Sequence, residues 1–124
     1  MAEHNNLGQK GELLAKQHLE AAGYEILDEN WRYGKAEVDL IAYLNKTIIF
    51  VEVKTRTGNA FGEPEDFVDA AKQKLLAGAA DEFIELMDFN GEARFDIIAI
   101  LFDKQGNHHL NHIQDAFWPE PGMR

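Results

Sequence analysis

The chain contains no cysteine, only three prolines, and no apolar run of the length that crosses a membrane. Without cysteine, a disulfide framework and a thiolate-based site are both excluded. A membrane-spanning helix needs roughly 18–20 apolar residues, and no stretch comes close. The first residues, Met-Ala-Glu-His-Asn-Asn, do not read as the basic and apolar leader of a secreted protein. We therefore expect a cytoplasmic protein without a membrane partner.

Basic side chains are also scarce. The 12 lysines and arginines are outnumbered by 22 aspartates and glutamates, which leaves a net charge of −10. Nucleic-acid-binding proteins usually carry a basic footprint. Residues 31–56 form the one block with net positive charge, and a phosphate-bearing partner would be expected there. The alternative, a solvated acidic surface with no partner, stays open. The basic residues of this block are Arg32, Lys35, Lys46, Lys54 and Arg56.

The length of 124 residues suggests one domain, assigned to residues 1–117, with a tail over 118–124 in which Pro119 and Pro121 oppose regular structure. Hydrophobic periodicity predicts the order α-β-β-β-α-β-β, which is an α/β domain with a central mixed sheet of about five strands flanked by helices. The strands on either side of the second helix are expected to be parallel. The predicted helices span 7–22 and 69–87, the strands span 24–27, 37–44, 47–54, 95–102 and 108–113, and turns or loops cover 28–30, 33–35, 55–64 and 88–94.

The stretch over residues 37–56 reads as a hairpin with charges inside its apolar runs. If the turn is centred on Asn45-Lys46, paired positions sum to 91. Asp39 then faces Glu52, and residue 37 faces Lys54. Residues directly opposite each other have Cβ atoms roughly 4.5–5.5 Å apart, so these side chains would converge on one face.

Two carboxylates directly opposite each other destabilise a sheet, and a bound divalent cation would offset that cost. Mg²⁺ prefers oxygen ligands, which Asp39, Glu52 and the backbone carbonyl of Val53 would supply. Lys54 could hold or deprotonate an attacking water, or neutralise charge in the transition state. The alternative is a solvated sheet face with cross-strand ion pairs, among them Glu37 with Lys54.

The two helices offer further polar residues. Glu12 adjoins the apolar stripe of the first helix, and it is either an exposed helix residue or a carboxylate delivered to the hairpin site. In the second helix, Lys72, Gln73 and Lys74 crowd the first two turns, where cations oppose the helix dipole. This misfit suits residues directed at an anion, although a solvated face would explain it too.

Three histidines near the end of the chain, His108, His109 and His112, look like a metal cluster. Four residues along a strand span roughly 13 Å, too far for two side chains to bind one ion, so we interpret them as surface or packing residues. Asp96 interrupts an otherwise apolar strand, and we expect Arg94, two residues away on the same face, to pair with it and support the sheet.

The sequences Glu-Val-Asp-Leu-Ile at 37–41 and Phe-Val-Glu-Val-Lys-Thr-Arg at 50–56 resemble the PD-(D/E)XK nuclease motif. Asp39 takes the place of its aspartate and Glu52-Val53-Lys54 that of its E-X-K. Over nearly its whole length the chain is similar to the YraN-like family, small bacterial proteins described as endonucleases and similar to archaeal Holliday junction resolvases. The likeness also includes Gly11-Glu12, Gly23-Tyr24, Asn30-Trp31-Arg32, Phe61-Gly62, Lys72-Gln73, Arg94-Phe95-Asp96, His112 and Ala116-Phe117.

This resemblance implies a restriction-endonuclease-like core and a metal-dependent endonuclease that hydrolyses DNA phosphodiester bonds, with branched or Holliday-junction-like DNA as a candidate substrate. Mg²⁺ or Mn²⁺ would be bound by Asp39 and Glu52 with Glu12 close by, and Lys54 would assist the water. Gln73 would be a further polar residue of the site. The expected nucleic-acid contacts are Arg32, Lys35, Arg56, Lys72 and the loop around Phe61-Gly62.

The chain departs from the family pattern in two respects. Ala36 stands where the family usually has glycine before the hairpin glutamate. The family is often basic, whereas this chain is acidic, and a homodimer would be one way to concentrate the positive blocks on one face. A non-catalytic nuclease-like domain that binds nucleic acid or a protein is therefore the alternative function.

Overall fold

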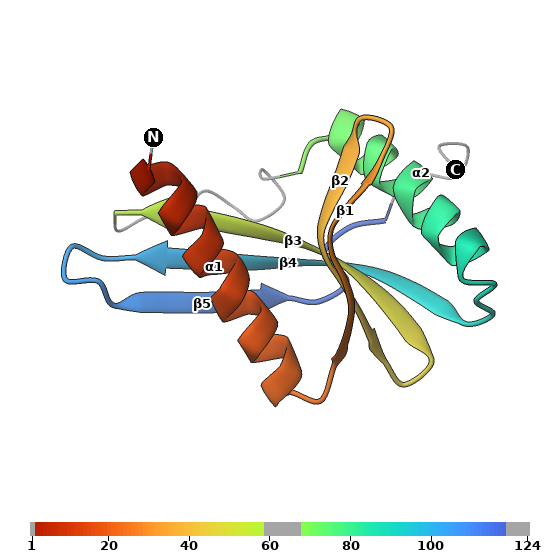
Figure 1. Ribbon diagram of the computed structural model, residues 1–124, viewed down its shortest axis with the longest axis horizontal. Coiled ribbons are helices and arrows are strands. Elements are labelled where there is room, and N and C mark those ends of the chain that lie inside the picture. The colour runs from red at the N-terminus through yellow and green to blue at the C-terminus, as the bar shows by residue number, and fades with distance from the viewer. Residues whose placement is uncertain (1, 59–67, 119–124) are drawn as a thin grey trace.

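Five strands form one open mixed sheet in the computed structural model, which describes residues 2–58 and 68–118. The sheet order follows the chain, β1-β2-β3-β4-β5, with only β3 and β4 parallel. Helix α2 makes the crossover between them (Figure 1). The predicted element order, the mixed sheet and the parallel pair are confirmed. The elements are α1 (Ala2–Ala21), β1 (Glu25–Tyr33), β2 (Ala36–Leu44), β3 (Thr47–Thr57), α2 (Ala70–Leu86), β4 (Glu92–Phe102) and β5 (His108–Ile113).

The hairpin of β2 and β3 turns at Asn45 and Lys46, whose φ angles of 51° and 61° lie in the left-handed region. Two such residues make the turn that matches the natural twist of paired strands. The pairing runs from Leu44–Thr47 to Leu40–Val51, which is the predicted register.

The predicted direct pairing of Asp39 with Glu52 is wrong in one respect. The β2–β3 ladder ends one step earlier, at Leu40–Val51. Beyond it, the N–H of Val53 donates to the Asp39 carboxylate, with 2.8 Å between N and Oδ2. A side chain thus satisfies a backbone donor that a continued ladder would have used.

The two strands separate because β2 changes the side to which its apolar residues point. Leu40 and Ala42 pack in the apolar cluster beneath α1. Ala36, Val38 and Ile41 pack in the other cluster, with α2. Strict alternation would have placed positions 36, 38, 40 and 42 on one face. Figure 1 shows the result: the β1–β2 hairpin rises steeply from the layer of β3, β4 and β5, between the two helices.

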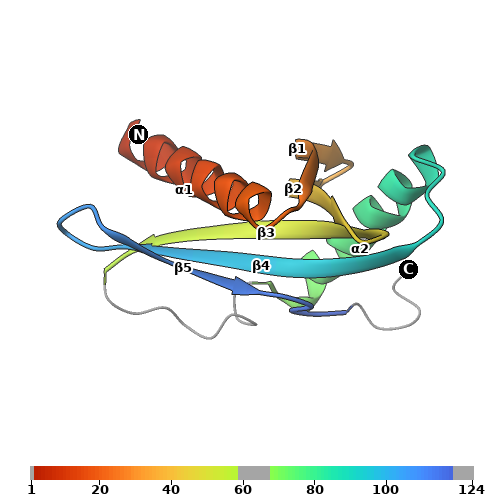
Figure 2. The same ribbon diagram turned by 90° about the horizontal axis from the view of Figure 1, so that it is seen from below.

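The helices cover the sheet through two separate apolar clusters. Figure 2 shows α1 lying over the long strands and α2 at the other end of the molecule. The α1 cluster contains Ala15, Leu19, Tyr24, Leu40, Ala42, Ile49, Val51, Ile98, Ile100 and Phe102. The α2 cluster contains Ala36, Val38, Ile41, Ile48, Phe50, Val68, Leu76, Ala79, Ala80, Phe83, Phe95 and Ile97.

The first strand is longer than predicted, and the expected turn at residues 28–30 is wrong. β1 continues through that polar segment because its backbone pairs with β2 as far as Tyr33–Ala36, with a bulge between Ile26 and Asp28. The predicted loop at 33–35 shrinks to a tight turn after Tyr33. β3 and β4 also exceed their predicted bounds, since they pair from Thr47–Glu92 to Thr57–Phe102.

Helix α2 begins as predicted. Asp69 caps it by accepting a hydrogen bond from the Lys72 N–H at 2.9 Å, and Met87 follows its last residue. Among the described residues, no helix is long and apolar enough to cross a membrane. The Phe61-Gly62 segment and the tail from Pro119 onward lie outside the described residues.

Candidate active site

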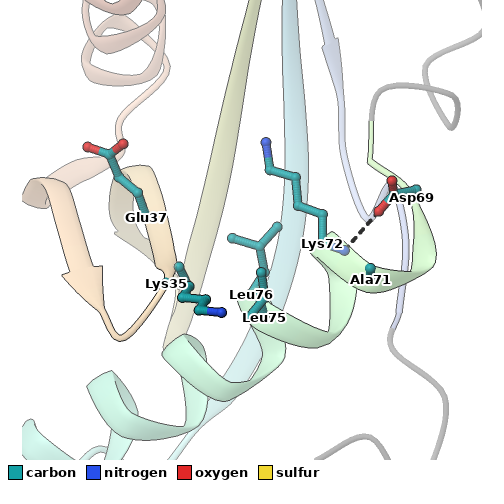
Figure 3. Close-up of a pocket in the computed structure, with 8 residues that line it drawn as sticks. Lys35, Glu37, Asp69, Ala71, Lys72, Leu75 and Leu76 are labelled. Atoms are coloured by element: carbon teal, nitrogen blue, oxygen red, sulfur yellow. Dashed lines mark hydrogen bonds between the residues drawn. The ribbon is translucent and has the colours of Figure 1, made fainter.

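Glu52 is a buried carboxylate with only one of its oxygens partnered. The residue is 3% exposed, and its Oε1 lies 2.8 Å from the Lys72 ammonium nitrogen. Its Oε2 is buried and has no hydrogen-bond partner among residues 2–58 and 68–118. Lys72 reaches this carboxylate from the first turn of α2, extending away from the helix toward the strands (Figure 3). An orphaned buried oxygen costs roughly 1–3 kcal/mol, so the site is poised for a further positive ligand.

Asp39 lies where β2 parts from β3, close enough to Glu52 for the two charges to interact. Burial, and then the charge of Glu52, raises the pKa of Asp39 to about 7. The hydrogen bond from the Val53 N–H favours the ionised form but does not outweigh burial. Near neutral pH the Asp39 carboxyl is therefore partly protonated, and a nearby cation would drive the proton off.

Two lysines share the space above these carboxylates. Lys54 follows Glu52 by two residues on the same face of β3, and its amine lies close enough to that of Lys72 for the two charges to interact. Burial and the neighbouring ammonium lower the pKa of Lys54. Burial also acts to lower the pKa of Lys72, but the ion pair with Glu52 outweighs it and the pKa is raised. The site therefore pairs an amine that loses its proton readily with one that keeps it.

Glu12 is brought to the edge of this site by close contact between α1 and β3. A Cβ on Gly11 would overlap the Thr55 hydroxyl oxygen, so only glycine allows the approach. Burial and the charge of Asp39 raise the pKa of Glu12, which also forms a side-chain hydrogen bond with Asn30. Gly8, three residues earlier on α1, makes no such approach, because a Cβ there would meet nothing within 4 Å.

The other expected site residues lie further from the carboxylates. Gln73 donates from Nε2 to the Val68 carbonyl at 3.1 Å, and no interaction within 2–58 and 68–118 joins it to Asp39 or Glu52. The Glu37–Lys54 ion pair of the alternative interpretation does not form among the described residues. β2 carries Glu37 away from β3 after the ladder ends, and Glu37 pairs with exposed Arg32 at 3.5 Å instead. Arg56 is exposed and donates to the Thr55 carbonyl, and Lys35 lines the same cavity as Lys72.

The donor set fits a hard divalent cation. No cluster of three or more histidine or acidic ligands occurs in the part of the chain that the structure describes. Mg²⁺ requires fewer, usually one or two carboxylates with water and phosphate completing its shell. Glu52 presents an unpartnered oxygen, and Asp39 has a carboxylate that a cation would help ionise. Glu12 is close enough to Asp39 for their charges to interact but does not complete a three-carboxylate cluster, and the role expected for the Val53 carbonyl stays a prediction.

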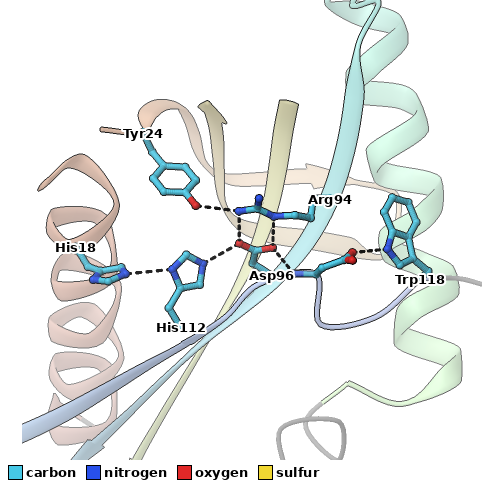
Figure 4. Close-up of polar contacts among 7 residues, drawn as sticks. His18, Tyr24, Arg94, Asp96, His112 and Trp118 are labelled. Carbon is cyan, nitrogen blue, oxygen red and sulfur yellow. Dashed lines mark hydrogen bonds and ion pairs between the residues drawn. The ribbon is translucent and has the colours of Figure 1, made fainter. Parts of the chain in front are cut away.

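A second polar cluster is centred on Asp96 and was only half anticipated (Figure 4). The Arg94 guanidinium donates two hydrogen bonds to this fully buried carboxylate, 2.8 and 2.9 Å long, as expected. His112 Nε2 lies 2.7 Å from Asp96 Oδ2, and its Nδ1 lies 3.1 Å from His18 Nε2. With Nε2–H of His112 donated to the carboxylate, its Nδ1 accepts from His18. The interpretation of His112 as a plain surface or packing residue is therefore incomplete.

This cluster ties α1 to the sheet and so helps to place Glu12. His18 is on α1 and His112 on β5, and Arg94 also donates to the hydroxyl of Tyr24 at 2.9 Å. Burial acts to raise the pKa of Asp96, but the hydrogen bonds from His112 and Arg94 hold it below its usual range. Burial and the neighbouring ring lower the pKa of His18. At neutral pH, Asp96 therefore stays ionised while His18 stays neutral.

Comparisons with known proteins identify relatives along nearly the full length. Residues 11–100 match the model of "Uncharacterised protein family UPF0102". A UPF0102 protein of Christiangramia forsetii is 50% identical over 118 residues, covering 95% of this chain and 98% of the relative. One from Bacteroides thetaiotaomicron is 43% identical over 119 residues, covering 96% and 98%. A more distant one, from Porphyromonas gingivalis, is 36% identical over 118 residues, covering 94% and 87%.

Proposed function

The chain belongs to the uncharacterised protein family UPF0102, and we propose that it is a metal-dependent endonuclease that hydrolyses phosphodiester bonds in DNA. The observation that carries the proposal is Glu52: a buried carboxylate with one unpartnered oxygen, beside a second carboxylate and two lysines. A structural ion pair would not need an orphaned oxygen or a neighbouring aspartate with a raised pKa. A bound cation would partner the free oxygen of Glu52 and would favour the ionised form of Asp39.

Phosphodiester hydrolysis needs charge neutralisation and control of a proton. The arrangement of Asp39 with Glu52-Val53-Lys54 resembles the PD-(D/E)XK nuclease site, which supports this chemistry. Water adds to phosphorus and gives one proton to a base, the bond from phosphorus to the leaving oxygen breaks, and that oxygen takes a proton from solvent to leave as a hydroxyl group. Burial lowers the pKa of Lys54, which suits it to take that proton or to hold the water. Lys72 retains its charge and can contact a phosphoryl oxygen.

Asp39 and Glu52 would hold the cation, with Glu12 next to them. A bound Mg²⁺ or Mn²⁺ would polarise a phosphoryl oxygen and neutralise charge that gathers during hydrolysis. The Lys72 ammonium already contacts Oε1 of Glu52, so the cation would bind at the unpartnered Oε2 and leave Lys72 in place beside the substrate phosphate. Lys72 would thus contact both the Glu52 carboxylate and the substrate phosphate.

The net charge of −10 favours a second candidate, a nuclease-like domain that binds nucleic acid or a protein without cutting. Such a domain would use Lys72 as a permanent partner of Glu52. The two candidates differ in one respect that can be measured, because only the nuclease converts substrate when a divalent cation is supplied.

The test is a cleavage assay on fluorescently labelled four-way, flapped and linear DNA, at low salt, with Mg²⁺, Mn²⁺ or EDTA. We expect cleavage that requires the cation and falls at least about 100-fold in Glu52→Gln, the loss typical of a missing catalytic group. Glu85→Gln is the matched control, because Glu85 is an exposed glutamate on α2. DNA binding without cleavage under every cation condition would favour the second candidate.

A further inference from the structure

We propose that a groove between the tip of the β1–β2 hairpin and α2 binds a single-stranded segment of DNA and leads it to the candidate active site. The inference rests on the proposed nuclease function and names the kind of substrate. The groove has a volume of about 580 Å³ and is lined by Tyr33, Gly34, Lys35, Ala71, Lys74, Leu75 and Gly78.

The groove continues into a second cavity that reaches Lys72 of the candidate site. This cavity, of about 320 Å³, shares Lys35, Ala71 and Leu75 with the groove and adds Lys72. The Lys72 ammonium lies 2.8 Å from Glu52. Figure 3 shows Lys35 extending from the hairpin toward Leu75, with Lys72 further along the same helix. A strand lying in the groove would therefore pass from the hairpin tip to Lys72, the lysine that contacts Glu52.

The hairpin tip carries a fixed aromatic surface. Tyr33 is 47% exposed and stacks on Trp31, with ring centroids 6.3 Å apart and planes 8° from parallel. Trp31 is held in turn by an edge-to-face contact with Phe83 of α2, 5.3 Å between centroids. One face of Tyr33 is thus fixed in place while the ring remains open to the groove. Base stacking on such a ring tolerates any sequence.

The charges along this path suit a phosphate backbone. Lys35 and Lys74 have no ion-pair partner among the residues that the structure describes. The two acidic side chains on the path are already engaged, because Glu37 pairs with Arg32 and Asp69 caps α2. The groove is therefore locally basic in a chain of strongly negative charge, and Leu75, 44% exposed, adds an apolar floor.

A single strand fits these features better than a duplex. The bases of a duplex are already stacked on their neighbours, so Tyr33 can receive only an unstacked base. A single strand also presents a lower charge density, which an acidic protein repels less. The groove therefore selects DNA with a single-stranded arm.

The test measures the fluorescence anisotropy of a labelled oligodeoxynucleotide of about 12 bases, in EDTA so that no cleavage occurs. We expect Tyr33→Ala to weaken binding about 5- to 150-fold, the loss of one stacked base, and Tyr33→Phe to keep it. Lys74→Ala should reduce the slope of log affinity against log salt by about 0.7, the value for one phosphate of a single strand. Lys104→Ala, in the β4–β5 loop at the opposite end of Figure 1, should bind as the wild type does.

Gly78→Leu separates groove occupancy from folding. A Cβ at Gly78 meets no atom within 4 Å, and leucine is a better helix former than glycine, so the variant should fold at least as stably. Its side chain would nonetheless occupy the groove, and we expect it to weaken single-strand binding as Tyr33→Ala does. Melting temperatures check that both variants fold.

Either of two results would overturn the inference. One is wild-type affinity in folded Tyr33→Ala and Gly78→Leu, and the other is tighter binding of a duplex or of the matching oligoribonucleotide. Failure of the inference can be told apart from failure of the proposed function. Cleavage with Tyr33-independent binding would remove the groove and leave the nuclease. Tyr33-dependent binding without cleavage in any cation would remove the nuclease and leave the groove.

Discussion

Replacing Asp39 with asparagine is expected to stabilise the metal-free protein at high pH and to stabilise it much less at low pH. The native pKa of Asp39 is about 7, against an ordinary value of 3.8, because the half-buried group loses solvent and lies near the charge of Glu52. A difference of about 3 in pKa corresponds to roughly 4 kcal/mol at about 1.36 kcal/mol each. Asparagine keeps the oxygen that accepts from the Val53 N–H and carries no charge to bury.

The direction follows from proton linkage. The folded protein binds the Asp39 proton more tightly than the unfolded chain does. This group therefore contributes most to the free energy of unfolding below pH 3.8, and its contribution is lost as the pH rises through about 7. Asparagine avoids the loss. Allowing for relaxation around the coupled Glu52, we expect a gain of about 2–4 kcal/mol at pH near 8 and about a quarter of that gain near 4.5.

The assay is urea unfolding in EDTA at both pH values, followed by tryptophan fluorescence. Trp31 reports the folded state well because its ring stacks on Tyr33 and packs against Phe83. Glu85→Gln removes an exposed carboxylate and should show no comparable pH-dependent gain. The reasoning is refuted if Asp39→Asn is less stable than the wild type near pH 8, or if its gain is equal at both pH values.

Three other substitutions have expected effects on stability. Lys72→Ala removes the partner of Glu52, 2.8 Å away, and should cost about 1–3 kcal/mol in EDTA, with Mg²⁺ restoring part of the loss; urea unfolding with and without the cation measures this. Asp96→Ala strands a part-buried guanidinium and should cost about 3–5 kcal/mol by the same method, so a loss under 1 would contradict the described network. Gly11→Ala creates an overlap with the Thr55 hydroxyl and should cost about 1–3 kcal/mol, and adding Thr55→Ala should recover part of the loss in a double-mutant cycle.

The hairpin was the most predictable part of the molecule. Apolar runs on both sides of Asn45-Lys46 identified the turn, and the register followed from its centre. The point where the strands separate was not predictable, because it depends on β2 turning its apolar residues toward a different helix. Alternation within one strand cannot reveal which helix that strand will pack against. As a result, Asp39 and Glu52 were correctly grouped, while the Glu37–Lys54 pair of the alternative interpretation does not form among the described residues.

Polar segments within paired strands were a second source of error. Residues 28–30 have the composition of a turn, yet β1 runs through them because its neighbours pair with β2 and because Trp31 packs on Phe83. Tertiary contacts here overrode a local signal. Residue type alone did not mark Tyr33 as an exposed platform, since an aromatic residue beside a strand is more often part of a core.

Long-range polar contacts were the least predictable. The Arg94–Asp96 pair was predictable, because an ionised group within an apolar strand needs a partner and Arg94 lies within reach on the same face. His18 and His112 lie 94 residues apart, and no periodicity relates them. A cation at a helix N-terminus indicated that Lys72 is directed at an anion. That this anion is Glu52 could not be predicted, because it depends on how α2 lies against β3.

The most direct test of the central claim is single-turnover cleavage of a DNA junction with one single-stranded arm, with Mn²⁺ or Mg²⁺, by the wild type, Glu52→Gln and Glu85→Gln. The buried carboxylate pair predicts cation-dependent cleavage by the wild type and Glu85→Gln, and a rate at least about 100-fold lower in Glu52→Gln. Equal rates for wild type and Glu52→Gln, or no cleavage by folded wild type with either cation, would contradict it.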